Sequence, residues 1–169
     1  MQAMRRTSGR RGQRNQHQEA IRHAVFIDVE NLAGCPCPSP FDVSFVESKV
    51  RECVPDLDHA QCVVACNHRA ARTVAFAFPG ALRRWRSGTD GADLALLEEM
   101  NDLRIMKRFA RVTLFSGDGI FTPAMAALAA AGIETTVVSW ESQLSRSLRM
   151  AAQHVVTLID PEATFGEAS

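Results

Sequence analysis

The chain has 169 residues, 46% of them hydrophobic and 22% charged, which is the composition of one globular domain with a sizeable core. No apolar run approaches the length of a transmembrane helix, and Arg5-Arg6 is followed by polar residues instead of the apolar segment of a secretory signal. Five cysteines, an odd number in a chain without an export signal, predict reduced thiols and a cytoplasmic location.

The formal net charge is zero, but the charges are unevenly distributed. Residues 1–23 contain six of the 19 basic residues and one of the 19 acidic residues, so the remaining chain is about five charges negative. We therefore expect a disordered basic arm at 1–22, a folded domain at 23–160 and a C-terminal tail at 161–169. The arm is either a binding segment for an anionic partner or a solvated leader, and a start at Met4 is also open.

Short apolar runs alternate along the chain with segments of helical periodicity. This alternation predicts an α/β fold with a mostly parallel sheet of about five to six strands and helices on both faces. We expect strands at 24–28, 59–66, 81–86, 111–115, 133–140 and 154–159, and helices at 41–53, 67–78, 92–101, 123–131 and 144–153. Cys62 and Cys66 lie in an apolar run and are expected to fill the core.

Three acidic residues stand where a parallel sheet would bring them together. Asp28 ends the first strand, Asp118 follows the strand at 111–115, and Asp93 lies in the first turn of the helix at 92–101. Because the carboxyl ends of parallel strands meet at one edge, these carboxylates can converge. Such a cluster suits Mg²⁺ or Mn²⁺, and with a phosphate substrate it predicts phosphodiester hydrolysis.

Each acid also has a structural interpretation. Asp90 could cap the helix that follows it, Asp93 would then be favoured by the helix dipole, and Asp118 could shape a turn between two glycines. Asp28 is the hardest to explain structurally, because a carboxylate at the end of a buried strand needs a partner.

Three segments resemble, in the right order, successive motifs of the NYN domain family: VFIDVEN at 25–31, GADLAL at 91–96 and SGDGIFTP at 116–123. These PIN-like ribonucleases include the bacterial LabA-like proteins, and the similarity runs from about 24 to 160. The resemblance implies a Rossmann-like PIN-like fold, dependence on Mg²⁺ or Mn²⁺, and cleavage of RNA.

The resemblance also assigns residues. It places metal-binding acids at Asp28, Asp93 and Asp118, and counts these with Asn31, a polar orienting residue, as the catalytic set. Ser116 would supply a hydroxyl near the third acid, and we count it among the RNA contacts.

Two positions depart from the family pattern. Many members carry an acid where this chain has Ile120, and many carry an Asp where it has Gln153. Glu99 matches another frequent acid, but at about 100° per residue it lies roughly 120° around the helix from Asp93. Asp90 is a weaker candidate, and the site is expected to hold one metal ion, or two weakly.

Contact with RNA requires basic residues near the acids. Arg86 ends a basic segment, 83–86, that contains Trp85, and Arg146 and Arg149 are spaced to face one way on the helix at 144–153. For Trp85 we prefer partial burial to base stacking, since tryptophan is usually mostly buried.

The leading hypothesis is a metal-dependent endoribonuclease acting on single-stranded or structured RNA, with no membrane partner and with a homodimer left open. The first alternative is an RNA- or protein-binding module of the same family with weakened or lost catalysis, because two expected acids are missing. The second is a haloacid-dehalogenase-like phosphatase, whose motifs are superficially echoed around Asp28 and Ser116.

Overall fold

The computed structural model describes residues 22–159, apart from the side chains of Leu103, Arg104 and Met106. The basic arm predicted over 1–22 (Arg22 excepted) and the tail predicted over 161–169 lie outside the described residues. The strands are β1 (His23–Asp28), β2 (Gln61–Cys66), β3 (Leu82–Trp85), β4 (Arg111–Phe115), β5 (Glu134–Trp140) and β6 (His154–Leu158). The helices are α1 (Val29–Ala33), α2 (Pro40–Cys53), α3 (Ala71–Ala77), α4 (Gly91–Met100), α5 (Leu103–Arg108), α6 (Thr122–Ala130) and α7 (Arg146–Ala151), with short 3₁₀ turns at Leu57–His59 and Gly119–Phe121.

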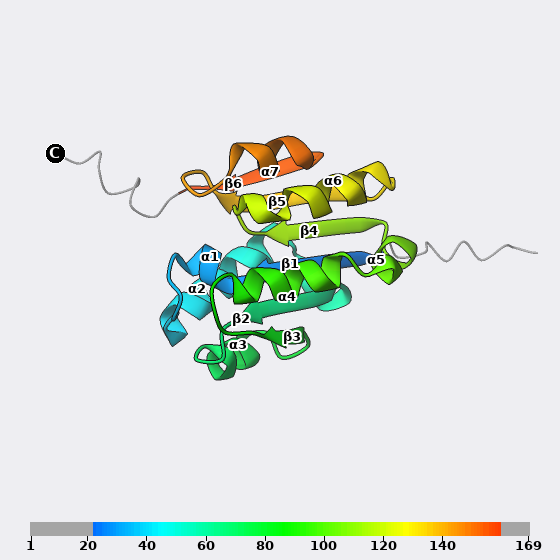
Figure 1. The fold of residues 1–169 in the computed structure, drawn as a ribbon. Coiled ribbons are helices and arrows are strands. Elements are labelled where there is room, and N and C mark those ends of the chain that lie inside the picture. The colour runs from blue at the N-terminus through cyan, green and yellow to red at the C-terminus, as the bar shows by residue number, and fades with distance from the viewer. Residues whose placement is uncertain (1–21, 160–169) are drawn as a thin grey trace, which may run out of the picture.

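The six strands form one sheet in the order β3-β2-β1-β4-β5-β6, and all five pairings are parallel (Figure 1). The predicted α/β fold with a mostly parallel sheet is therefore confirmed. This strand order is that of a Rossmann-like doubly wound sheet, in which the chain moves outward from β1 in one direction and from β4 in the other.

Hydrophobic layers cover both faces of the sheet. In β1, Ala24 and Phe26 face the layer that contains α4, α6 and α7, whereas Val25 and Ile27 face the layer that contains α1, α2 and α3. α4 and α6 lie in front of the sheet in Figure 1. Since side chains alternate along a strand, a strand covered on both faces must be apolar throughout, which explains the unbroken apolar run before Asp28.

Two helices differ from the prediction. The expected helix at 67–78 begins only at Ala71, because the Asn67 side-chain oxygen accepts bonds from the backbone N–H groups of Arg69 and Ala70 and holds a turn there. α5 was not predicted. It has six residues, too few for an apolar period to show, and it forms where Ile105 and Phe109 pack against the core.

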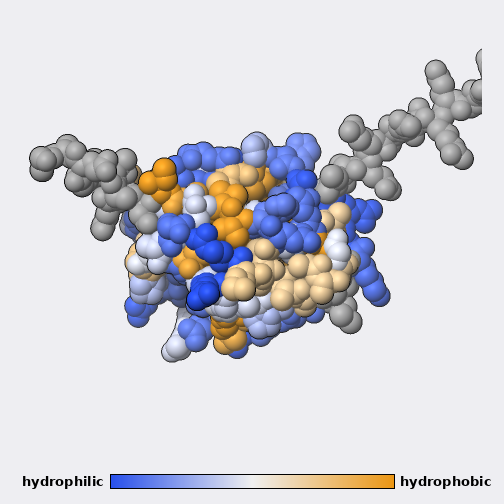
Figure 2. Space-filling view, turned by 90° about the horizontal axis from the view of Figure 1, so that it is seen from above, coloured by the Kyte–Doolittle hydropathy of each residue, from blue (hydrophilic) through white to orange (hydrophobic). Residues whose placement is uncertain are grey.

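The β6 edge of the sheet exposes several apolar side chains. Met150, Val156 and Ile159 are 77%, 41% and 78% exposed. Figure 2 looks down on this side of the molecule and shows apolar patches among hydrophilic ones. Over the described part of the chain, no helix combines the length and the apolarity that crossing a membrane would require.

Candidate functional site

The sheet reverses its strand order between β1 and β4, and the candidate site lies at the carboxyl ends of these two strands. Ile27 of β1 pairs with Phe115 of β4, so Asp28 and Ser116, the next residue of each chain segment, stand side by side. In open parallel sheets, crevices that bind ligands form at such a reversal. The location of the candidate site therefore follows from the topology of the sheet alone.

Asp28 is the centre of the site and is only 2% exposed. Its Oδ1 accepts a bond from the backbone N–H of Asn31, at 3.1 Å, so the side chain also caps the start of α1. Its Oδ2 accepts the Ser116 hydroxyl at 3.0 Å. Two donors thus hold the carboxylate in one orientation although it is removed from solvent.

Asp93 lies against Asp28 in the first turn of α4, close enough for a hydrogen bond between the two side chains. Burial, followed by the negative charge of Asp93, raises the pKa of Asp28 well above its usual value. Burial also raises the pKa of Asp93, and the charges of Asp118 and Asp90 add to this. The pair therefore favours holding a proton, or another cation, between its carboxylates.

Asp118 completes the predicted set from the end of β4. It is exposed, and its Oδ1 accepts the backbone N–H of Ile120 at 2.9 Å, so it does shape a turn, as the structural interpretation predicts. The turn is fixed to α1, because the side-chain oxygen of Asn31 accepts the N–H of Gly117 at 2.9 Å. Asn31 thus orients the segment that carries Asp118.

Ser116 corrects one expectation. It is fully buried, so it does not reach RNA as predicted. Its hydroxyl donates to Asp28 and accepts the backbone N–H of Asp118 at 3.2 Å. Ser116 therefore links two of the acids, and the sequence could not reveal this because the burial of a side chain depends on segments distant in the sequence.

We expect the Ser116→Ala variant to lose about 1 kcal/mol of unfolding free energy, the value of a typical buried hydrogen bond. Because the hydroxyl bond lowers the pKa of Asp28, its loss should raise that pKa further and slow turnover, whereas affinity for RNA should not change. Binding by fluorescence anisotropy and cleavage by gel assay separate the two effects. Ser48→Ala, on the exposed face of α2, is the control; an RNA affinity that falls as much as turnover would contradict this role.

The acids line a common pocket of about 300 Å³. Asp90 lies on its wall. It occupies the N-cap position of α4, as the structural interpretation predicts, but its side chain makes no capping hydrogen bond, and its backbone has a left-handed φ of 54°. Glu30, absent from the predicted set, also lines the pocket, and burial raises its pKa. Its position two residues after Asp28, at the end of the strand, was the signal that could have identified it. The polar lining contributed by acids and amide is Asp28, Glu30, Asn31, Asp90, Asp93 and Asp118.

The donors fit a hard divalent cation. All are oxygen atoms, and a cation would relieve the repulsion that raises the pKa values of Asp28 and Asp93. However, no three His, Cys, Asp or Glu side chains among residues 22–159 are grouped closely enough to hold one ion together. Asp28 and Asp93 are the close pair, and Asp118 acts on Asp93 through charge. The three acids predicted from the sequence therefore line one pocket, but only Asp28 and Asp93 are in contact, and Asp118 lies beside them.

Two acids of α4 are kept out of the pocket by arginines of β3 and the residue after it. Glu99 pairs with Arg84 at 2.7 Å, and Glu98 pairs with Arg86 at 2.6 Å. This agrees with the helical geometry that separated Glu99 from Asp93. Trp85, between the two arginines, is partly buried against the core.

The cations predicted to bind RNA are not equally available. Arg86 is already paired, and Arg149 pairs with Glu141 at 2.7 Å. Arg146 is exposed and forms no ion pair with any described residue. The same holds for Arg69, just before α3, and Arg72, in its first turn, which the sequence reasoning missed. The available signal was two arginines within six residues of the end of β2.

The two departures from the family pattern have structural explanations. Ile120 packs against the core, and its N–H holds Asp118. Gln153 exchanges two hydrogen bonds with Thr135, near the amino-terminal end of β5. That end is opposite to the acidic pocket, so an acid at 153 would not be a ligand there.

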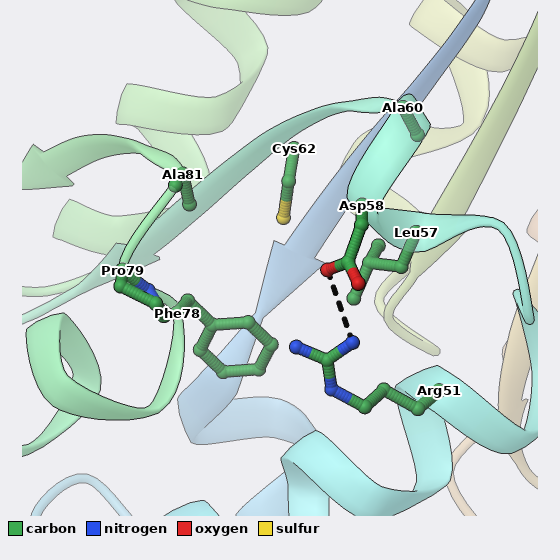
Figure 3. A pocket seen from close by; sticks show the side chains of 9 residues that line it. Arg51, Leu57, Asp58, Ala60, Cys62, Phe78, Pro79 and Ala81 are labelled. Carbon is green, nitrogen blue, oxygen red and sulfur yellow. Dashed lines mark hydrogen bonds and ion pairs between the residues drawn. The ribbon is translucent and has the colours of Figure 1, made fainter.

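A second, smaller pocket lies at this opposite edge (Figure 3). Cys62 points into it between Phe78 and the ion pair of Arg51 with Asp58, which has a 3.1 Å separation. Cys62 is 7% exposed, and burial raises the pKa of its thiol to about 12. Its predicted role as core filler is supported, and a thiol held in the protonated form is a poor nucleophile.

Comparison with known proteins gives a family and a fold. A family model described as "NYN domain" matches residues 22–159. A crystal structure of a protein of unknown function from Vibrio parahaemolyticus is similar, with a TM-score of 0.52 and 16% identity over 82% of this chain and 93% of that chain. At this identity the likeness extends to the fold alone. Curated proteins provide no match.

Proposed function

Because this chain belongs to the NYN domain family of PIN-like nucleases, we propose that it is a metal-dependent endoribonuclease that hydrolyses RNA phosphodiester bonds. The catalytic set is Asp28, Asn31, Asp93 and Asp118, and the ion is Mg²⁺ or Mn²⁺. The observation that carries the proposal is the close carboxylate pair of buried Asp28 and half-buried Asp93, which opens into a pocket lined by Asp118.

A pair of this kind destabilises a metal-free protein. Burial raises the pKa of both carboxyls. The charge of Asp93 adds to the shift of Asp28, and the charges of Asp118 and Asp90 add to the shift of Asp93, so folding opposes ionisation of the pair. Groups perturbed in this way concentrate at functional sites. A divalent ion offsets the repulsion, and oxygen-only ligation selects hard cations.

Asp28 and Asp93 would hold the ion, with Asp118 beside them. When bound, such an ion lowers the pKa of water and neutralises charge on a phosphate. The chain's own groups keep the ligands in place: Ser116 and the Asn31 N–H hold Asp28, and the Asn31 side chain fixes the turn that carries Asp118. The acidic pocket repels RNA until it is neutralised, so metal binding and RNA binding should depend on each other.

An RNA- or protein-binding module is the second candidate. It is favoured by the absence, among the described side chains, of a ready three-acid metal cluster and by Ile120 in place of a further acid. The phosphatase alternative is not carried further, since the family match is to the NYN domain.

Asp93→Asn tests the proposal. We expect native protein to bind Mn²⁺ in a calorimetric titration and to cleave a fluorescent single-stranded RNA. The variant should lose at least tenfold in Mn²⁺ affinity, corresponding to about 1.4 kcal/mol, because half of the close pair loses its charge. Asp56→Asn, an exposed acid before the 3₁₀ turn at Leu57–His59, is the control. Native protein that binds neither Mg²⁺ nor Mn²⁺ at millimolar concentration would favour the binding module instead.

A further inference from the structure

A groove of about 450 Å³ separates α2 from α3, on the face of the sheet away from α4. Pro40 and Val43 contribute to its α2 wall, and Arg72 and Phe76 to its α3 wall. The two helices pack side by side at the lower left in Figure 1. The groove is larger than the acidic pocket and separate from it in its lining residues.

Two phenylalanines at this surface are exposed without a structural need. Phe76 in the groove is 76% exposed, and Phe41, next to Pro40, is 79% exposed. Val74 and Phe78 are buried and pack the inward face of the same segment against the core, so Phe76 is not needed there. Large apolar side chains kept in water in this way mark binding surfaces, and an open aromatic face is a stacking platform for an unpaired base.

Positive charge that no described acid neutralises lies in the groove wall, at Arg72, and just before α3, at Arg69. Arg69 and Arg72 are exposed and form no ion pair with the acids of the described chain, unlike Arg86 and Arg149. The one acid in the groove wall, Glu47, is itself paired with Arg51 at 2.6 Å. Unpaired arginines can bind phosphate groups, and an exposed aromatic ring beside them can stack on a base, so this combination suits a nucleic acid.

A loop and a side-chain hydrogen bond connect the acidic pocket with the helices that border the groove. Pro36 lines the pocket, and its carbonyl accepts the Asn67 side-chain amide. The Asn67 side-chain oxygen accepts the backbone N–H of Arg69 at 2.8 Å. Pro40, four residues after Pro36, starts α2 and lines the groove. One loop and one amide side chain thus join the two surfaces.

We propose that the groove between α2 and α3 binds the single-stranded RNA that extends from the cleavage pocket. Arg69 and Arg72 contact phosphates, and Phe76 stacks on a base. The inference rests on the proposed function for the link to cleavage, but the groove's own affinity for RNA does not depend on catalysis. An unpaired strand is required because the bases of a duplex are not free to stack on a side chain.

The test is binding of a fluorescent single-stranded RNA of mixed sequence to full-length protein in EDTA, measured by anisotropy at several salt concentrations. Phe76→Ala should weaken binding about fivefold or more and leave the salt dependence unchanged. The Arg69→Ala/Arg72→Ala double variant should weaken binding and reduce the slope of log affinity against log salt by about 1.4, at roughly 0.7 per phosphate contact on a single strand. Duplex RNA of the same sequence should not distinguish Phe76→Ala from native protein.

Two matched controls lie away from the groove. Met150→Ala removes a side chain that is 77% exposed on α7, and Lys107→Ala removes an exposed cation at the end of α5. Both should bind as native protein does, and thermal unfolding verifies that each variant is folded. Equal affinities for the groove variants and the controls would overturn the proposal and leave the groove to a protein partner. Groove-dependent binding without cleavage in Mn²⁺ would instead contradict the nuclease proposal alone.

Discussion

Asp28→Asn is expected to abolish RNA cleavage and at the same time to stabilise the metal-free protein. Loss of the central ligand removes several kcal/mol of stabilisation of the transition-state charge, which corresponds to about 10³-fold or more in rate. The asparagine keeps an oxygen for the Asn31 N–H but carries no charge that would repel Asp93. We expect a gain of about 1 kcal/mol in unfolding free energy at pH 7.5 in EDTA.

The pH dependence of this gain follows from the raised pKa of Asp28. In native protein the folded state keeps the proton that the unfolded chain has already lost, so stability falls as pH rises from the usual carboxyl range through the raised pKa. Asp28→Asn has no such proton at this position. Its advantage should therefore be present at pH 7.5 and shrink towards pH 4, where the unfolded chain also begins to bind the proton at position 28.

Urea unfolding at the two pH values measures the stability, and a gel assay in Mn²⁺ measures cleavage. Asp58→Asn makes the same change in an exposed acid at the opposite edge of the sheet and should preserve cleavage. Cleavage by Asp28→Asn at the native rate would remove Asp28 from the mechanism. A stability loss at pH 7.5 would contradict the repulsion that we describe for the pair.

Gly117→Ala is expected to destabilise the fold by about 1–3 kcal/mol or more. A Cβ at this position would lie 2.4 Å from the carbonyl oxygen of Gln143 and 2.5 Å from the Ser139 hydroxyl oxygen. The first of these is a backbone atom that cannot rotate away. Relief requires the turn after β4 to shift, which would also break the bond from the Gly117 N–H to Asn31 and displace Asp118.

Gly80→Ala provides the matched comparison, because no atom lies within 4 Å of its added Cβ. It should be neutral or stabilise slightly, since alanine restricts the unfolded chain more than glycine does. Chemical denaturation gives both stabilities, and Mn²⁺-dependent cleavage reports the position of Asp118. Equal stabilities for the two variants would show that the loop around Gln143 yields easily.

The elements and their order were readable from the sequence because they depend on local patterns. The apolar run before Asp28 specifies a strand covered on both faces, and Gly132 after an alanine-rich segment specifies a helix end; both are found within a residue or two. The convergence of Asp28, Asp93 and Asp118 was predictable as well, because parallel strands direct all their carboxyl ends to one edge. α5 was not predicted because it is stabilised by packing against the core and is too short to show a helical period of apolar residues.

Only the tertiary structure determines which side chains are buried and which form hydrogen bonds or ion pairs with each other. In the sequence, Ser116 and Glu30 both lie two residues from a predicted metal-binding acid. In the structure, Ser116 is fully buried, whereas Glu30 lines the pocket. Arg86 and Arg72 have the same side chain, but α4 offers Glu98 to the first, whereas no acid among residues 22–159 forms an ion pair with the second. Local periodicity specifies which way a strand or helix faces, whereas burial, pKa and pairing depend on atoms contributed from distant parts of the chain. Asp28 shows both. Its place at a strand end is a local property, whereas its pKa is raised by burial under distant segments and by the charge of Asp93, 65 positions away in the sequence.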